Sequence, residues 1–162
     1  MVDGVVVKLE GIDELKKALA DVSKKIRVKA VRSALRKAGA VIAKAARQSA
    51  PVLHVPTKKR HTGTVRKNIA VRNSKFARQA GDEGVFVGVR PLRGSRQKKL
   101  GKAGAANPND PFYWRFLEFG TKKMARRAFL GPAVQQEGEN AIKEFMNHVI
   151  PQIEKLDKKA GL

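Results

Sequence analysis

Apolar residues recur at intervals of three and four through the first third of the chain, from residue 15 to residue 45. This spacing places one apolar stripe on the inward face of a helix and leaves the lysines and arginines on the rest of its surface. Asp13 is the expected N-cap, and Pro51 ends the pattern. The sequence therefore predicts a long amphipathic helix, with a break expected near Ser23 or Gly39.

Shorter segments alternate apolar and polar residues, as half-buried strands do. Residues 5–9 predict a short opening strand, and residues 64–72 and 84–90 predict the two strands of a small antiparallel sheet. Residues 73–83 join these two strands and carry turn-forming residues at each end. Residues 112–119 are compatible with two further strands, or with a strand and a short helix.

Helical spacing returns after Pro132, a residue that suits the first turn of a helix. Pro151 is expected to kink or end this last helix, and residues 157–162 are expected to form a frayed tail. Residues 91–111 show no periodicity and are rich in Gly, Ala, Asn, Pro and charge, so they predict a long mobile basic loop. The order of elements predicts one α+β domain over residues 1–162: an N-terminal strand and long amphipathic helix, a small antiparallel sheet with the basic loop, and a C-terminal helix.

Composition narrows the function classes. The chain has 162 residues, which suits one domain, and a formal net charge of +21, which favours polyanions or acidic protein surfaces as partners. It has no cysteine, so disulfides and thiolate metal sites are excluded. No window reaches the length of a membrane span, and the start of the chain lacks the apolar core of a signal peptide. No membrane partner is expected.

Candidate catalytic groups are sparse. His54 and His61 lie seven residues apart in one loop, a spacing that matches no zinc signature. Glu118 has no second carboxylate near it in the sequence, so a paired acid–base site is not supported. The simplest expectation for Glu118 is an ion pair with a nearby cation, one of Arg115, Lys122 and Lys123. The sequence predicts no enzyme, no cofactor and no metal.

Residues 58–102 contain fourteen lysines and arginines but only two acids, Asp82 and Glu83. Such a segment can hold nucleic-acid phosphates without reading the base sequence. A basic surface that meets an acidic protein explains the same charge equally well, and charge alone does not separate the two. The candidate contact residues are Lys58, Lys59, Arg60, Arg93, Arg96, Lys98, Lys99 and Lys102.

Residues 116–133, FLEFGTKKMARRAFLGPA, combine aromatics, a single carboxylate and four cations. Five of the nine aromatic residues of the chain lie within residues 112–119. Gly120 permits a tight turn, after which the cations project from a corner closed by apolar residues. The residues alone leave two interpretations of this corner open: a joint between subunits, or a packed corner that touches no partner. Its candidate residues are Trp114, Glu118, Gly120, Thr121, Arg126, Arg127, Phe129 and Pro132.

Several motifs in a fixed order carry a family resemblance. They are KLEGIDELKKAL at 8–19, ARQSAP at 46–51, TGTVRKNI at 62–69, VFVGV at 85–89, the aromatic-Glu-Phe-Gly-Thr corner at 113–121, and FLGPA at 129–133. In this order they resemble the tail-component or neck-protein family of long-tailed double-stranded DNA bacteriophages, the HK-ninety-seven-type gene-product-ten family. Members often carry Pro-Ala-Arg-Pro before Phe-Leu, where this chain has MARRA at 124–128.

The resemblance implies a non-enzymatic structural protein of the virion that acts at the head-to-tail junction, in the neck, in tail completion or as a tail terminator. Relatives form rings, commonly hexamers, around the channel through which DNA passes. The implied partners are copies of this chain, adjacent neck or connector proteins and tail-tube proteins, with non-specific contact to double-stranded DNA. The implied locations are the virion and, during assembly, the host cytoplasm. A non-specific nucleic-acid-binding protein unrelated to virions is the alternative.

Overall fold

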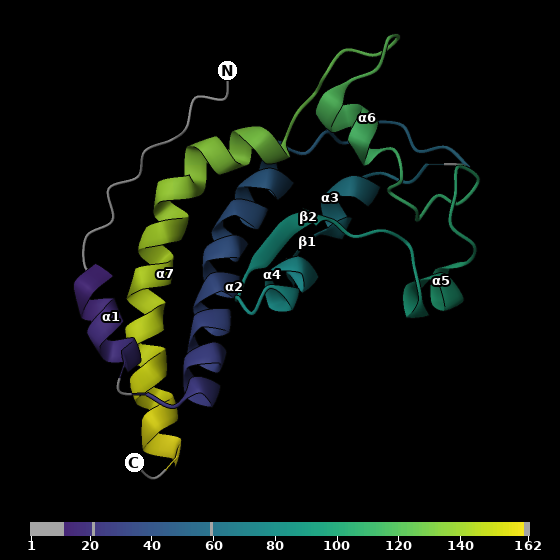
Figure 1. Cartoon of the computed structure of the whole chain (residues 1–162). Helices are drawn as coiled ribbons and strands as arrows, with labels where there is room; N and C mark the ends of the chain where they lie inside the picture. The colour runs from purple at the N-terminus through teal and green to yellow at the C-terminus, as the bar shows by residue number, and fades with distance from the viewer. Residues whose placement is uncertain (1–11, 21, 59, 161–162) are drawn as a thin grey trace.

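The computed structural model describes residues 12–20, 22–58 and 60–160 (Figure 1). The strand expected at residues 5–9 lies outside the described residues. The α+β fold class is confirmed: long helices flank a two-stranded antiparallel sheet. The elements in chain order are α1 (Ile12–Ala20), α2 (Lys24–Ser49), α3 (Thr64–Asn68), β1 (Ile69–Asn73), α4 (Lys75–Gln79), β2 (Val85–Val89), α5 (Ser95–Leu100), α6 (Trp114–Phe119) and α7 (Leu130–Ala160).

The expected break in the first helix occurs at Ser23, which separates α1 from α2. The Ser23 side chain caps α2 by accepting a hydrogen bond of 3.5 Å from the backbone N–H of Ile26. Gly39 does not break the helix. A β-carbon there would lie 2.8 Å from Cγ1 of Val71, so the glycine lets α2 approach the sheet closely. Asp13 lies inside α1 rather than at its N-cap, so that expectation was wrong.

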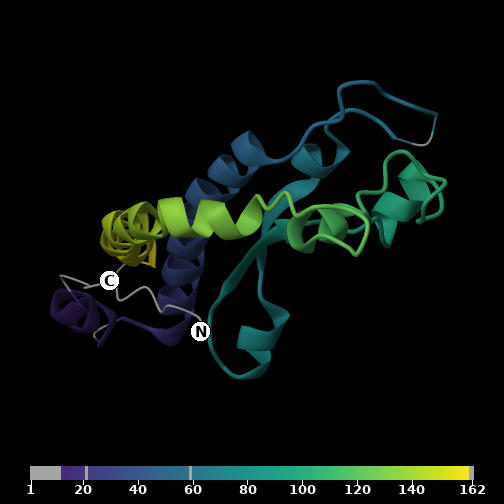
Figure 2. The ribbon, with the colours of Figure 1, turned by 90° about the horizontal axis from the view of Figure 1, so that it is seen from above.

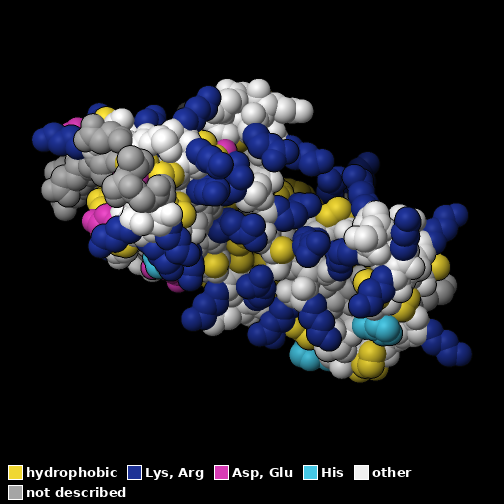
Figure 3. All heavy atoms as spheres, turned by 90° about the horizontal axis from the view of Figure 1, so that it is seen from below, with side chains coloured by type: hydrophobic (Ala, Val, Ile, Leu, Met, Phe, Trp, Pro, Cys, Tyr) yellow, Lys and Arg dark blue, Asp and Glu magenta, His cyan; other side chains and the backbone are white. Residues whose placement is uncertain are grey.

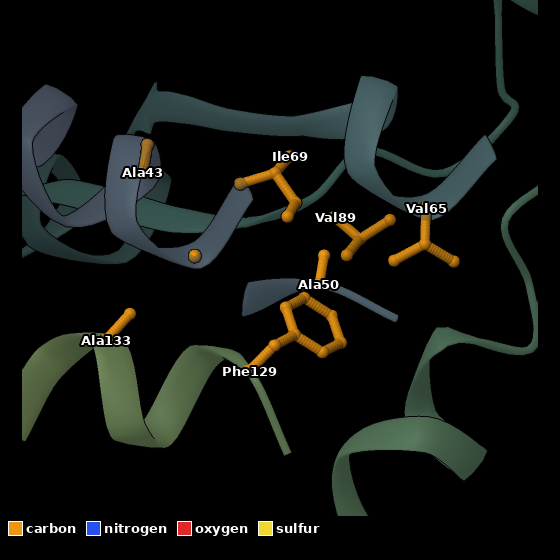
Figure 4. Packing of buried hydrophobic residues seen from close by; sticks show 8 residues of the cluster. Ala43, Ala50, Val65, Ile69, Val89, Phe129 and Ala133 are labelled. Atoms are coloured by element: carbon orange, nitrogen blue, oxygen red, sulfur yellow. The ribbon is translucent and has the colours of Figure 1, made fainter. Parts of the chain in front are cut away.

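The core has two parts along α2, which lies beside α7 (Figures 1 and 2). The first half of α2 packs on the second half of α7 through small residues such as Ala30 and Ala34, which contact the region of Val149 and Ile153. The second half packs between the sheet and the start of α7 (Figure 4). The buried residues of this second cluster are Ala43, Ala46, Ala50, Val65, Ile69, Val89, Phe129 and Ala133.

The sheet pairs β1 with β2 in antiparallel register, from Ile69 opposite Val89 to Asn73 opposite Val85. The small antiparallel sheet is therefore confirmed, but the first half of the strand expected at 64–72 is the helix α3. Within α3, the side-chain amide of Asn68 donates a 2.8 Å hydrogen bond to the carbonyl of Thr64. Alternation over so few residues does not distinguish a strand from a helical turn.

The last helix, α7, is longer than the sequence predicted. Pro132 lies in its first turn, as expected. The helix continues through Pro151 to Ala160, so of the two expectations for Pro151, a kink or an end, the end was wrong. Ile153 is buried against α2, and tertiary packing of this kind offsets the backbone hydrogen bond that proline removes. Residues 157–160, expected as part of a frayed tail, are helical.

Residues 91–111 extend away from the long helices (Figure 2) and include α5, which the sequence did not predict. Hydrogen bonds tie the segment to itself: the Asp110 carboxylate accepts from the backbone N–H of Gly104 at 2.7 Å. The Asn107 amide donates to the carbonyls of Leu100 and Lys102, at 2.8 and 3.0 Å. The mobility of this loop stays a prediction.

Candidate functional site: a basic corner built on one buried carboxylate

The corner begins with α6, the short helix that was one of two expectations for residues 112–119. The backbone N–H of Trp114 donates to the carbonyl of Pro111 at 2.9 Å, which starts the turn. The rings of Phe112 and Phe116 then meet edge to face, with centroids 6.4 Å apart. The helix ends at Gly120, where φ is 75°.

Glu118 is the structural centre of the corner. Its side chain is buried, with 5% of the residue exposed, and its carboxylate accepts three backbone hydrogen bonds. Oε2 accepts from Phe129 at 2.9 Å and from Leu130 at 3.0 Å, and Oε1 accepts from Gly131 at 2.9 Å. These N–H groups lie at the start of α7 and have no acceptor within that helix. Glu118 therefore caps a helix that begins more than ten residues later in the chain.

The electrostatics of Glu118 follow from this geometry. Burial alone would raise the pKa of its carboxyl, but the three backbone N–H donors and the nearby charge of Arg126 hold the pKa below its usual value. The carboxylate is thus ionised at neutral pH and faces the positive end of the α7 dipole. The expected ion pair with Arg115, Lys122 or Lys123 was wrong, because backbone groups take that place.

Residues 120–128 form a loop that projects beyond α6 (Figure 1). Thr121 and Met124 exchange two backbone hydrogen bonds of 2.9 and 3.3 Å, which close a tight turn at the tip. Arg127 donates its backbone N–H to the carbonyl of Leu117 at 2.8 Å, which fixes the last part of the loop against α6. The side chains of all four cations in the loop are exposed: Lys122, Lys123, Arg126 and Arg127.

The candidate corner residues divide by exposure. Phe129 is completely buried, and Trp114 and Pro132 are half-buried, so with Glu118 they build the corner from inside. Gly120 and Thr121 shape the turn. Arg126 and Arg127 face solvent, and so do aromatic residues that were not among the candidates: Phe119 is 70% exposed and Phe116 is 47% exposed. Their shared helical spacing was the sequence signal for an exposed aromatic face.

The basic residues of the segment 58–102 also divide. The guanidinium of Arg60 lies 4.9 Å from the ring centroid of Phe112 and donates to the carbonyl of Ala105 at 2.8 Å. Arg96 donates to the carbonyl of Pro91 at 3.1 Å and to the side chain of Asn68, and burial lowers its pKa. These two arginines brace the loop internally. Lys59 lies outside the described residues, whereas the remaining candidates are exposed: Lys58, Arg93, Lys98, Lys99 and Lys102.

No catalytic or metal-binding arrangement accompanies the corner in the described part of the chain. His54 and His61 are exposed, and the described residues hold no group of three or more His, Asp or Glu side chains that could bind a metal ion. None of the described helices is long and apolar enough to cross a lipid bilayer. The corner offers binding chemistry: exposed rings beside fixed positive charge.

Comparison with known proteins gives a family match. Residues 13–120 match the family described as "Bacteriophage HK97-gp10, putative tail-component". No curated protein and no solved structure matches the chain. The match spans α1 to α6 and ends at Gly120, so the cations at 122–127 and the start of α7 lie beyond it.

Proposed function

The chain belongs to the bacteriophage HK97-gp10 family of tail components, and from that premise we propose that it assembles into a closed ring at the head-to-tail junction. The ring would act in the neck or in tail completion, and DNA would pass through it. The subunit would work without catalysis or a cofactor, and it would join copies of itself to adjacent neck, connector and tail-tube proteins. Copies would come together in the host cytoplasm.

One observation carries this proposal. The hydrogen bonds to Glu118 hold α6 against the start of α7, and the corner built in this way exposes aromatic and cationic side chains. Exposed aromatics and arginines are typical of the centre of protein interfaces. Because the loop is hydrogen-bonded at both ends before any partner arrives, docking would cost little ordering of the backbone. Phe116, Phe119, Arg126 and Arg127 would therefore form one half of the subunit joint.

A ring also needs a second, different surface on each subunit, since contacts between neighbours in a ring are heterologous. The corner lies at one end of the molecule, and the opposite ends of α1, α2 and α7 lie far from it (Figure 1).

The exposed cations of the 91–111 loop would meet acidic surfaces of adjacent rings. These are Arg93, Lys98, Lys99 and Lys102.

Electron microscopy of the nucleic-acid-free protein at high concentration tests the ring, with the double variant Phe116→Ser, Phe119→Ser as the probe. The matched control is Phe76→Ser, because Phe76 is also an exposed aromatic, at 82%, but lies on α4. We expect closed rings for the natural chain and the control, and dispersed subunits for the double variant. Dispersed natural subunits even in the presence of purified tails would contradict the proposal.

The alternative, a nucleic-acid-binding protein with no part in the virion, is favoured by the formal charge of +21. It predicts normal joining of heads and tails in particles made without the chain. The ring proposal predicts instead that heads and tails accumulate separately. Counting joined particles by microscopy separates the two functions.

A further inference from the structure

Helix α2 carries an unusual charge pattern. Its 26 residues, Lys24–Ser49, include nine lysines and arginines and no acid. Four of the cations recur at intervals of four, three and four residues, so their side chains share one face of the helix: Lys25, Lys29, Arg32 and Arg36. Like charges at these spacings destabilise a helix. Helix stability therefore does not explain the pattern.

The start of this face forms a hollow with the end of α7. The hollow has a volume of about 340 Å³, and Lys25, Lys29 and Lys159 line it together with Ser23, Ile26 and Leu156. Three lysines from two helices thus line one space. In the part of the chain that the structure describes, no carboxylate forms a salt bridge with any of the three. The site is suited to an anion from outside the subunit.

One cation of this face, Arg32, is already paired within the subunit, with the carboxylate of Glu83. The guanidinium of Arg32 donates two hydrogen bonds to Glu83, of 2.8 and 2.7 Å. The hydrogen bond from Arg32 is the main cause that lowers the pKa of Glu83, so this acid is ionised and already paired at neutral pH. Lys25, Lys29 and Arg36 remain available to a ligand.

The chemistry of the face fits phosphate better than a protein surface. The large apolar side chains exposed in the described residues lie on other elements, and none lies on α2. Protein interfaces combine charge with exposed apolar or aromatic contact, whereas the two apolar residues of this hollow, Ile26 and Leu156, are buried and half-buried. The four cations span about 16 Å of helix, a length over which one strand of B-DNA presents about five phosphates. Figure 3 shows lysines and arginines spread over the underside of the molecule, where α2 begins, with few acids among them.

We propose that this face of α2, together with Lys159 of α7, binds the phosphate backbone of duplex DNA without regard to base sequence. The inference deepens the proposed function because it assigns the DNA contact to the α2 face, rather than to the 58–102 segment. It depends on that function only for the presence of DNA in the channel. Binding by the isolated subunit can be measured whether or not rings form.

The test compares two triple variants that each remove three positive charges. The first is Lys25→Gln, Lys29→Gln, Lys159→Gln on the α2 face, and the control is Lys98→Gln, Lys99→Gln, Lys102→Gln on the 91–111 loop. All six lysines are exposed, so both variants should fold, which circular dichroism checks. Binding of a duplex of about 30 base pairs is measured from about 50 to about 300 mM salt.

We expect the α2 variant to lose at least ~10-fold in affinity at ~100 mM salt and to flatten the slope of log K against log salt by about 2 to 3. The control should change the slope by less than about 1. Equal losses in both variants, a larger loss in the control, or no binding by the natural chain would each overturn the assignment. So would an α2 variant that binds DNA normally but fails to join tails, because the face would then serve an acidic protein. Ring formation seen by microscopy is a separate result, so the ring proposal can survive any of these outcomes.

Discussion

Glu118 and Phe129 are joined by a hydrogen bond of 2.9 Å, from the backbone N–H of Phe129 to Oε2 of the buried carboxylate. The bond connects α6 to the start of α7 across the loop of residues 120–128, and two further bonds from Leu130 and Gly131 complete the contact. One side chain therefore ties the two ends of the loop between these helices together. A change at Glu118 should disturb the corner more than a change at any of its exposed cations.

Glu118→Gln should lower the free energy of unfolding by about 1.5–3 kcal/mol, the usual cost of removing a charged hydrogen-bond acceptor from a buried group. The amide keeps one acceptor oxygen, so either its NH₂ group faces Gly131 or it faces the N–H groups of Phe129 and Leu130. Urea unfolding followed by circular dichroism measures the change. The control is Glu139→Gln, an exposed carboxylate on α7, expected within about 0.5 kcal/mol of the natural chain. Similar losses in both variants would contradict the capping role.

The same carboxylate should make stability depend on pH. Its folded-state pKa is lowered, so its contribution is fully present above the unfolded pKa of about 4.3 and is lost as pH falls through the folded pKa. The difference in unfolding free energy between the natural chain and Glu118→Gln should therefore be largest near neutral pH and shrink in acid. Unfolding curves for both chains at pH 7 and at about pH 3 test this. A constant difference would show that the carboxylate charge is not what stabilises the corner.

Gly120→Ala should destabilise the loop at its first turn. The residue has φ of 75°, and a β-carbon there would lie 3.1 Å from the carbonyl oxygen of Met124, a backbone atom that cannot move aside cheaply. With ψ at 180°, this conformation lies in a region that essentially only glycine occupies, and it costs roughly 1–3 kcal/mol for another residue. The control, Gly138→Ala, lies inside α7 with open space around it and should stabilise by about 0.5–1 kcal/mol. Thermal unfolding of the two variants should shift in opposite directions, and a shift in the same direction would refute the strain at Gly120.

Much of this fold follows from local patterns, because periodicity reports which side of an element is buried. It placed α2 and the first turn of α7, and Ser23 gave the break between α1 and α2 through its capping side chain. Periodicity did not identify the short elements. Alternation in TVRKN predicted a strand where α3 forms, and α5 has too few apolar residues to show any period.

The corner shows the other limit of prediction from sequence. The position of Glu118 among aromatics marked it as a candidate, but the groups that donate hydrogen bonds to it gave no signal in the sequence. Its partners are backbone N–H groups of Phe129, Leu130 and Gly131, which every non-proline residue carries, so no side-chain pattern could identify them. A search for nearby cations was the natural expectation and gave the wrong partner. The α2 face was hidden for a related reason, since its lysines were accounted for as the solvated side of an amphipathic helix.

The pair of Arg32 and Glu83 gives a last prediction that couples stability to DNA binding. Glu83→Gln removes the carboxylate that Arg32 holds through two hydrogen bonds. The change loosens the link between α2 and the segment that joins α4 to β2, and it frees a guanidinium on the cationic face. We expect a lower unfolding temperature together with tighter binding of duplex DNA at low salt. The control Asp82→Asn changes the net charge equally at the neighbouring exposed residue and should do neither to the same extent. If both variants tighten DNA binding equally, overall charge rather than the freed Arg32 is responsible, and the α2 face loses one of its supports.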